Sequence, residues 1–241
     1  IGGKEGMASI LNNIGFLYNN KGQVKEALDY HGRSLKIREE IGDKQGIAGS
    51  LINIGAIYRN QGQVKECLTY YNRSLKIYED TENKMGVATT LNNTAAIYSS
   101  QNKIKEALDY YNRSLKIYEE IGYQVGIAAA LINIGSIYID QGRVKEALAY
   151  HNRSLQIYKE MGYKKGIASC LSSIGNILNK QGNLKETLLY GQKSLSISQE
   201  IGSPFNIKKA SNLLSKVYEK QGQGMKALEM YKLHITMKDS L

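Results

Sequence analysis

The 241-residue chain contains no Trp, one Pro, two Phe and two Cys. Two cysteines cannot form a disulfide framework, so a small disulfide-stapled fold is excluded. Pro204 is the single proline. This scarcity of proline favours helices, because proline disrupts a helix interior and helical chains avoid it. No apolar run approaches the roughly 18 residues that a membrane-spanning helix needs, and we expect no membrane insertion.

Against these absences stand 24 Gly and 18 Tyr. The hydrophobic residues make up 42% of the chain and are spread evenly along it, which argues against disorder. The net charge of +10 admits an acidic partner without requiring one. The chain starts with neither an initiator Met nor a signal peptide. We expect a cytoplasmic protein, with an extracytoplasmic sensor region as the alternative.

A repeat of 40 residues runs through the chain without slippage. The pattern Asn-Ile-Gly-X-X-Tyr at residues 13–18 returns at 53–58 and 133–138. A fixed period in this range indicates a solenoid, in which each unit packs only on its neighbours. We predict one continuous domain of six units, at residues 6–45, 46–85, 86–125, 126–165, 166–205 and 206–241. Residues 1–5 align with 41–45 and are predicted to end a preceding unit, as in a fragment of a longer protein.

Each unit contains two segments with helical period. In the first unit, Leu11, Ile14, Gly15 and Tyr18 form a stripe at i, i+3, i+4 and i+7. A polar break at residues 21–23 ends this helix. The second segment has a wide apolar face, as a solenoid helix that contacts two neighbours requires. The sequence therefore predicts an all-α fold with about twelve helices and essentially no strand.

These motifs resemble the tetratricopeptide repeat (TPR), in a form longer than the usual 34 residues. The family's first-helix signature is matched by Leu51, Gly55 and Tyr58, and its small-then-aromatic second-helix signature by Ala107 and Tyr111. The family's terminal Pro is absent, which fits longer second helices. The resemblance covers the whole chain and implies a right-handed superhelical solenoid of six helix-turn-helix units. It also implies a protein-interaction scaffold with no catalysis of its own.

Function in such a fold is expected in its concave groove, lined by first-helix positions opposite the packing stripe. One of these positions holds Asn in four units, although mid-helix Asn is disfavoured against Ala by roughly 0.5–0.7 kcal/mol. An Asn amide can donate to and accept from the backbone of an extended peptide. The predicted groove residues are Asn13, Asn53, Asn93, Asn133, Asn20, Asn60, Phe16, Lys180, Lys209, Lys216 and Lys220.

The repeated asparagines have two interpretations. The resemblance supports peptide binding, because some family members bind peptides through asparagines at the matching position. Alternatively, each Asn bonds to the neighbouring helix or merely records recent duplication. Both interpretations stay open on sequence alone.

The groove lysines are concentrated in the last two predicted units. An acidic segment could engage that end, with electrostatics setting its orientation more than its affinity. The alternative is a solubilising surface. No nucleic acid is expected, because the groove offers little aromatic interleaving and no Arg cluster. The carboxylate clamp of some family members is not carried over, because Asn12 and Phe16 occupy the positions of its Lys and Asn.

No catalytic residue, metal site or cofactor is predicted. His31 and His151 occupy the position that holds Tyr71 and Tyr111 in other units, which favours a packing role. No His, Cys or carboxylate set has metal-ligand spacing, and no Gly-rich loop follows a strand. We therefore expect a non-enzymatic scaffold that binds a peptide or protein segment in its groove. The alternative is a regulatory or sensor region of a bacterial signalling protein (a kinase, cyclase or transcription regulator), or a peptide receptor. The sequence indicates neither the partner's identity nor the oligomeric state.

Overall fold

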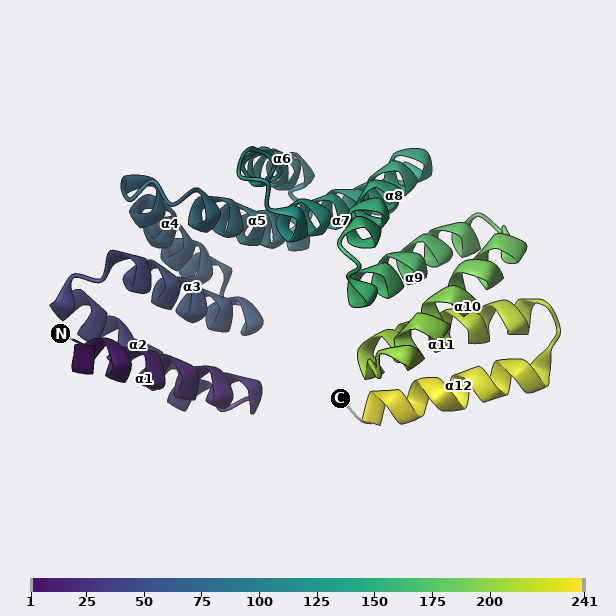
Figure 1. Ribbon diagram of the computed structural model, residues 1–241, viewed down its shortest axis with the longest axis horizontal. Coiled ribbons are helices and arrows are strands. Elements are labelled where there is room, and N and C mark those ends of the chain that lie inside the picture. The colour runs from purple at the N-terminus through teal and green to yellow at the C-terminus, as the bar shows by residue number, and fades with distance from the viewer. Residues whose placement is uncertain (1, 240–241) are drawn as a thin grey trace. The chain divides into compact units, whose positions relative to one another are not determined.

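The computed structural model describes residues 2–239, and all secondary structure in that range is α-helical (Figure 1). This confirms the predicted all-α repeat array, with twelve helices and no strand among the described residues. The helices are α1 (Gly2–Asn20), α2 (Val24–Ile41), α3 (Lys44–Asn60), α4 (Val64–Asp80), α5 (Lys84–Ser100), α6 (Ile104–Glu120), α7 (Gln124–Asp140), α8 (Val144–Glu160), α9 (Lys164–Lys180), α10 (Leu184–Glu200), α11 (Pro204–Lys220) and α12 (Gly224–Asp239).

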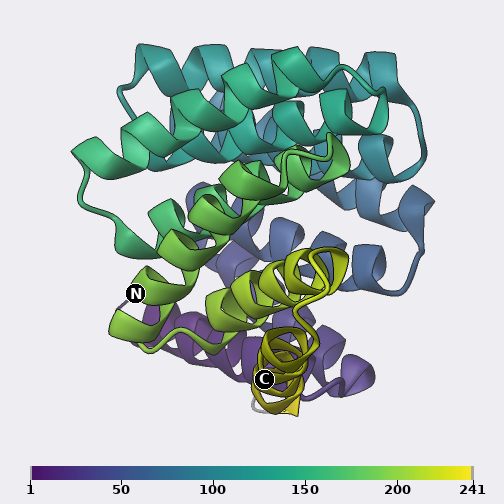
Figure 2. The same ribbon diagram turned by 90° about the vertical axis from the view of Figure 1, so that its right-hand side faces the viewer.

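The helices pack as antiparallel pairs, each made of an odd-numbered helix and the even-numbered helix that follows it. Figure 1 shows this arrangement for the α11–α12 pair, and Figure 2 shows the same helices turned by 90°. The chain divides after Gly122 into two compact units. The N-terminal unit holds α1–α6 and the C-terminal unit holds α7–α12, so each contains three helix pairs.

Local capping sets where the helices begin. The Asp43 carboxylate accepts a hydrogen bond of 2.9 Å from the backbone N–H of Gly46, and the Asn83 side chain accepts an equivalent bond from Gly86. Helices α3 and α5 therefore begin two residues before the glycines that lead the predicted units. Pro204 opens α11, where its missing N–H and fixed φ do no harm.

The residues that align with 42–45 are helical at the start of the chain. Gly2–Glu5 lie within α1, whereas the aligned Gly42 has a φ of 71° and interrupts the helix. The Nζ atom of Lys4 in this segment lies 2.9 Å from a carboxylate oxygen of Glu40. Lys84 and Lys164, each the first residue of an odd-numbered helix, make the same ion pair 36 residues along the chain.

A buried serine joins the two helices of each of the first five pairs. Its hydroxyl donates to a backbone carbonyl in the preceding helix, and each such bond contributes about 0.5–1.5 kcal/mol. The bonds are Ser34 to Ala8 (2.7 Å), Ser74 to Ala48 (3.0 Å), Ser114 to Ala88 (2.8 Å), Ser154 to Ala128 (3.0 Å) and Ser194 to Ala168 (2.7 Å). In the sixth pair, the Nδ1 atom of His234 lies 3.0 Å from the carbonyl oxygen of Lys208.

The two helices of a pair also approach closely where a glycine, which has no Cβ atom, lies between them. A Cβ atom at Gly55 would lie 2.7 Å from the Tyr71 ring, and one at Gly135 would lie 3.0 Å from the His151 ring. The third pair has Ala95 at the aligned position, fully buried, so one methyl group is accommodated there. The packing stripe predicted from the sequence is therefore where these helices come closest.

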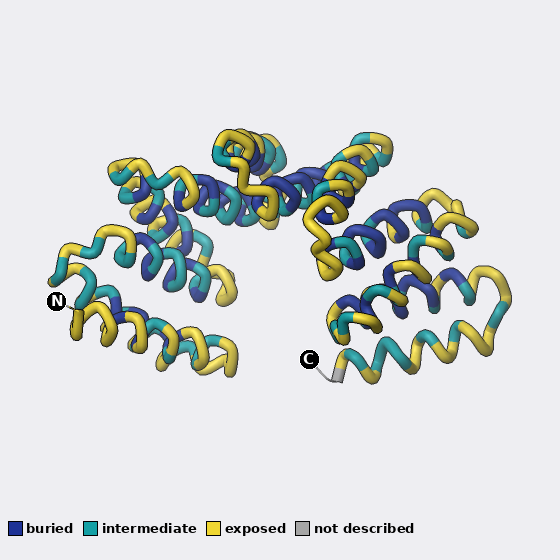
Figure 3. The backbone as a smooth tube through the Cα atoms, viewed as in Figure 1, coloured by how far each residue is buried: buried dark blue, intermediate teal, exposed yellow. Residues whose placement is uncertain are grey.

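Burial is uneven along the chain (Figure 3). Ile57 in α3 is 1% exposed, whereas the aligned Leu17 in α1 is 58% exposed. At the other end, none of the described side chains of α12 is buried, and Met225 is 82% exposed. None of the described helices combines the length and apolar composition that crossing a membrane requires.

Candidate functional site

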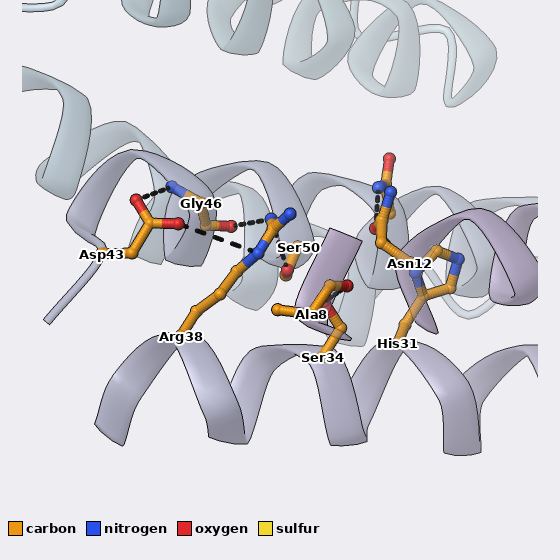
Figure 4. Close-up of polar contacts among 9 residues, drawn as sticks. Ala8, Asn12, His31, Ser34, Arg38, Asp43, Gly46 and Ser50 are labelled. Atoms are coloured by element: carbon orange, nitrogen blue, oxygen red, sulfur yellow. Dashed lines mark hydrogen bonds and ion pairs between the residues drawn. The ribbon is translucent and has the colours of Figure 1, made fainter. Parts of the chain in front are cut away.

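The predicted asparagine row lies on the odd-numbered helices. In the N-terminal unit, Asn13 is exposed, whereas Asn53 and Asn93 are half-buried. The side-chain amide of Asn53 donates a 2.8 Å hydrogen bond to Oδ1 of Asn12 in α1. The same oxygen lies 3.1 Å from Nδ1 of His31 (Figure 4). For Asn53, the structure therefore shows the helix-to-helix bond that the sequence left open as an alternative.

The other asparagines are not equivalent to Asn53. Asn133, in the C-terminal unit, is engaged in an interaction within the chain. Asn13 and Asn93 have no side-chain hydrogen bond to any other described residue. The amides that the fold leaves available are thus those of Asn13 and Asn93, together with the Oδ1 atom of Asn53.

The remaining candidates of the N-terminal unit face solvent. Phe16 is 56% exposed, and Asn20 and Asn60 are exposed near the end of their helices. These exposed candidates on α1 and α3 are themselves uncharged. No charged groove candidate was predicted for this unit, and its helices supply none of the four predicted groove lysines.

Arg38 makes a polar contact that the sequence analysis missed. Its guanidinium donates to the carbonyl oxygen of Gly46 (2.6 Å) and lies 3.1 Å from the Ser50 hydroxyl (Figure 4). Its side chain is 14% exposed and also lies 3.9 Å from the Asp43 carboxylate. In the second pair, Tyr78 stands at the aligned position. Arg38 therefore joins α2 to α3, and it is not available to a ligand.

The four predicted lysines of the C-terminal unit do not converge on one point. Lys220 donates a 2.9 Å hydrogen bond to Oδ1 of Asn179. Lys209 lies over the Phe205 ring, 4.6 Å from its centre, and burial lowers the pKa of its ammonium group. Lys180 and Lys216 are exposed. Two of the lysines thus make structural contacts, whereas Lys180 and Lys216 present their charge to solvent.

A small polar pocket of about 150 Å³ opens between α7 and α9, beside α8. It is lined by Ser136, Ile139, His151, Ser173, Asn176, Ile177 and Lys180. The pocket therefore brings Lys180 together with residues at the predicted groove positions of two neighbouring repeats. The sequence analysis placed Lys180 in the groove but treated His151 only as a packing residue.

His151 is 1% exposed, yet neither of its ring nitrogens has a hydrogen-bond partner. Burial lowers the pKa of this imidazole, so the ring is neutral near pH 7. The sequence already indicates that His151 lacks the partner that His31 has. The residue aligned with Asn12, the partner of His31, is Ile132, which cannot form a hydrogen bond with its side chain.

Among the described residues, the two cysteines and His31 are buried and have shifted pKa values. Among residues 2–238, no three His, Cys, Asp or Glu side chains are arranged to hold a metal ion. Cys67 and Cys170 are buried free thiols, and burial raises the pKa of both, which disfavours the reactive thiolate. Burial also lowers the pKa of His31, with a further contribution from the Arg38 guanidinium.

Comparison with known proteins is consistent with the geometry. Family models described as tetratricopeptide repeat match residues 46–120 and 126–200, and a second such model matches residues 7–41. No curated protein sequence matches the chain significantly.

Solved structures share the fold at low sequence identity. BtubC (BKLC) from P. vanneervenii is 14% identical, with a TM-score of 0.78 over 90% of this chain and 91% of its own. The Rap conjugation gene regulator of plasmid pLS20, in complex with the Phr* peptide, is 14% identical, with a TM-score of 0.70 over 97% and 74%. The STAND protein PH0952 from Pyrococcus horikoshii, which has a tetratricopeptide repeat sensor, is 14% identical, with a TM-score of 0.75 over 98% and 37%. At this identity, the likeness supports the fold alone.

Proposed function

The chain belongs to the tetratricopeptide repeat family, and on that basis we propose that it is a non-catalytic scaffold that binds an extended peptide or protein segment. The proposed binding surface, called the groove face below, is the side of the odd-numbered helices that carries the predicted groove residues. The observation that carries the proposal is the set of uncommitted amide groups at Asn13 and Asn93, with the free Oδ1 of Asn53.

The spacing of the helices suits an extended ligand. Packed helices lie about 8–10 Å apart, and three extended residues span roughly the same distance. One repeat can therefore engage one backbone group of every third ligand residue or so. The peptide complex of the Rap regulator supports the proposal, because it is an example of a peptide-bound protein with this fold.

The two units differ in the charge they offer. The predicted groove residues of the N-terminal unit are uncharged, whereas Lys180 and Lys216 are exposed in the C-terminal unit. An acidic stretch of the ligand would therefore bind at the C-terminal unit and set the orientation of the ligand.

The proposal is tested by selecting peptides from a randomised library on the 241-residue chain. The test variant replaces Asn13, Asn53 and Asn93 with Ala. The matched control replaces Asn72, Asn112 and Asn152, which are exposed on even-numbered helices. Each lost hydrogen bond weakens binding by about 0.5–1.5 kcal/mol, so the test variant should bind the selected peptides at least ten-fold more weakly.

The control should bind the peptides with unchanged affinity. Equal affinity of both variants, or equal loss, would contradict a role for the groove face. The melting temperature of the test variant must be compared as well. A fall in stability that accounts for the fall in affinity would assign the asparagines to helix packing instead.

The charge component is tested separately with two pairs of substitutions that remove the same charge. Replacing Lys180 and Lys216 with Ala should weaken binding of acidic peptides, and the loss should shrink at high salt because exposed charges are screened. Replacing Lys145 and Lys185, which are exposed on even-numbered helices, should leave binding unchanged. Equal losses from the two pairs would show only a general charge effect.

A regulatory form of the same function is the second candidate. There, occupancy of the groove would control an attached catalytic or DNA-binding domain, as the sensor of PH0952 suggests by its fold. This form makes the same predictions for the groove face. It adds one measurement, a change in the activity of the attached domain when a selected peptide is added.

A further inference from the structure

The imidazole of His151 is the least satisfied polar group in the C-terminal unit. Its side chain is 1% exposed, and neither nitrogen has a partner among the described residues. A buried polar group without a partner destabilises the fold, so such a group calls for an explanation. Packing alone would be served by tyrosine or phenylalanine, and Tyr71 and Tyr111 occupy the aligned positions.

Comparison with the first repeat isolates what is special. His31 and His151 each lie against a glycine, Gly15 and Gly135, at a similar distance. His31 meets the amide oxygen of Asn12 at 3.1 Å, whereas Ile132 stands at that place in the fourth repeat. Only the fourth repeat therefore has an imidazole that is both buried and without an internal partner.

His151 lines the 150 Å³ pocket on the groove face. Pockets for drug-sized molecules measure roughly 300–1,000 Å³, so this one suits a single side chain. Lys180 is the only charged residue in its lining, and no carboxylate lines it. The hydroxyl of Ser136 and the amide nitrogen of Asn176 already donate to carbonyls of their own helices. The remaining donors are the ammonium group of Lys180, the imidazole N–H of His151, the hydroxyl of Ser173 and the second N–H of the Asn176 amide.

We propose that this pocket binds the carboxylate of an Asp or Glu side chain in a ligand lying on the groove face. The proposal deepens the proposed function and rests on it for the source of the side chain. The neutral imidazole donates through one nitrogen to one carboxylate oxygen, and the Lys180 ammonium pairs with the other. Such bonds involve an ionised group and are stronger than neutral ones. The pocket thereby adds a preference for one acidic residue to backbone binding by the asparagines.

The proposal can be tested without knowing the natural ligand. The probe is N-acetyl-glutamate N-methylamide, a blocked glutamate whose only carboxylate is in its side chain. N-acetyl-glutamine N-methylamide is the uncharged control, and N-acetyl-alanine offers a carboxylate at the chain end. NMR of the full chain labelled with ¹⁵N-histidine follows the ring nitrogens of His31 and His151 during each titration.

We expect blocked glutamate to shift the His151 nitrogens in a saturable way and to bind at least ten-fold more tightly than blocked glutamine. The His31 signals should not move, because Asn12 already occupies that ring. Stronger binding of N-acetyl-alanine would assign the site to a chain end instead of a side chain and would overturn the proposal as stated. No shift of His151, or equal shifts of His31, would also overturn it.

Variants separate the pocket from general charge. Lys180→Ala should weaken blocked glutamate at least ten-fold, whereas Lys185→Ala, which removes the same charge from an even-numbered helix outside the pocket, should have no effect. In His151→Phe, blocked glutamate should bind at least ten-fold more weakly, as measured by calorimetry. Should that variant fail to fold, His151→Tyr serves, because tyrosine fills this position in the second and third repeats. Unchanged binding in a folded variant at position 151 would contradict the proposal.

The outcomes also distinguish the two proposals. If library selection yields peptides with no acidic preference and His151 does not respond to blocked glutamate, the pocket proposal fails and the scaffold proposal stands. If blocked glutamate binds at His151 but no peptide is ever selected, the pocket stands and peptide binding along the groove face fails.

Discussion

The N-terminal and C-terminal units contain the same histidine in the same setting, with opposite consequences. In the N-terminal unit, the Asn12 oxygen meets both the ring of His31 and the amide of Asn53, so three polar groups satisfy one another. In the C-terminal unit, Ile132 removes that oxygen and His151 faces a pocket instead. The backbone arrangement is retained in both. One variable position on an odd-numbered helix therefore decides whether a buried histidine has an internal hydrogen-bond partner.

The largest expected effect comes from filling the space that Gly135 leaves for the His151 ring. Gly135→Leu should lower the free energy of unfolding by roughly 1–3 kcal/mol or more, because even a Cβ atom would lie 3.0 Å from the His151 ring. Gly32→Leu is the matched control, since a Cβ atom at Gly32 meets nothing within 4 Å. Urea unfolding of both variants measures the difference. Equal free energies of unfolding for the two variants would mean that the packing of His151 does not require a glycine at position 135.

Converting one unit to the arrangement of the other should have a smaller effect. Asn12→Ile leaves His31 without its partner and should cost about 1–3 kcal/mol, with part of the loss coming from Asn53. The reciprocal Ile132→Asn should give His151 a partner and reduce its response to blocked glutamate. Thermal unfolding and the histidine NMR signals report the two results. A stable Asn12→Ile variant would show that the Asn12 oxygen contributes little.

The smallest expected effect concerns pH. Burial lowers the pKa of His31 and His151 from an ordinary value of 6.5, so the unfolded chain takes up protons there before the folded chain does. Stability is therefore complete above about pH 6.5 and falls as the pH drops towards the folded-state pKa values. The melting temperature should fall between about pH 7.5 and 5.5, and less so after both histidines are replaced with Phe. An identical fall in the double variant would assign the pH dependence to other groups.

Periodicity made most of the fold predictable. The stripe of Leu11, Ile14 and Gly15 repeats every 40 residues, and helices with that pattern have to bury it against each other. The glycines at which the two helices of a pair approach closely belong to the same stripe, so their positions were predictable as well. The helix caps formed by Asp43 and Asn83, by contrast, were not predicted. They place the starts of α3 and α5 two residues before the predicted repeat boundaries.

The polar contacts were less predictable because they join positions that vary between repeats. Asn53 meets Asn12, and Lys220 meets Asn179, each pair 41 residues apart. A repeated asparagine looks alike in every unit, yet its partner depends on the varying residue in the preceding odd-numbered helix. The pocket at His151 was missed for the same reason, since its character comes from what Ile132 does not provide.

The serine that joins the two helices of each of the first five pairs has a consequence for how such a chain can change in length. Each hydroxyl bonds to a carbonyl 26 residues earlier, inside its own pair, so the fastening of one hairpin does not involve the next. A repeat of 40 residues can then be inserted or removed without breaking the serine hydrogen bond inside its helix pair. Such a chain can grow or shorten by whole hairpins while each repeat keeps its own variable residues.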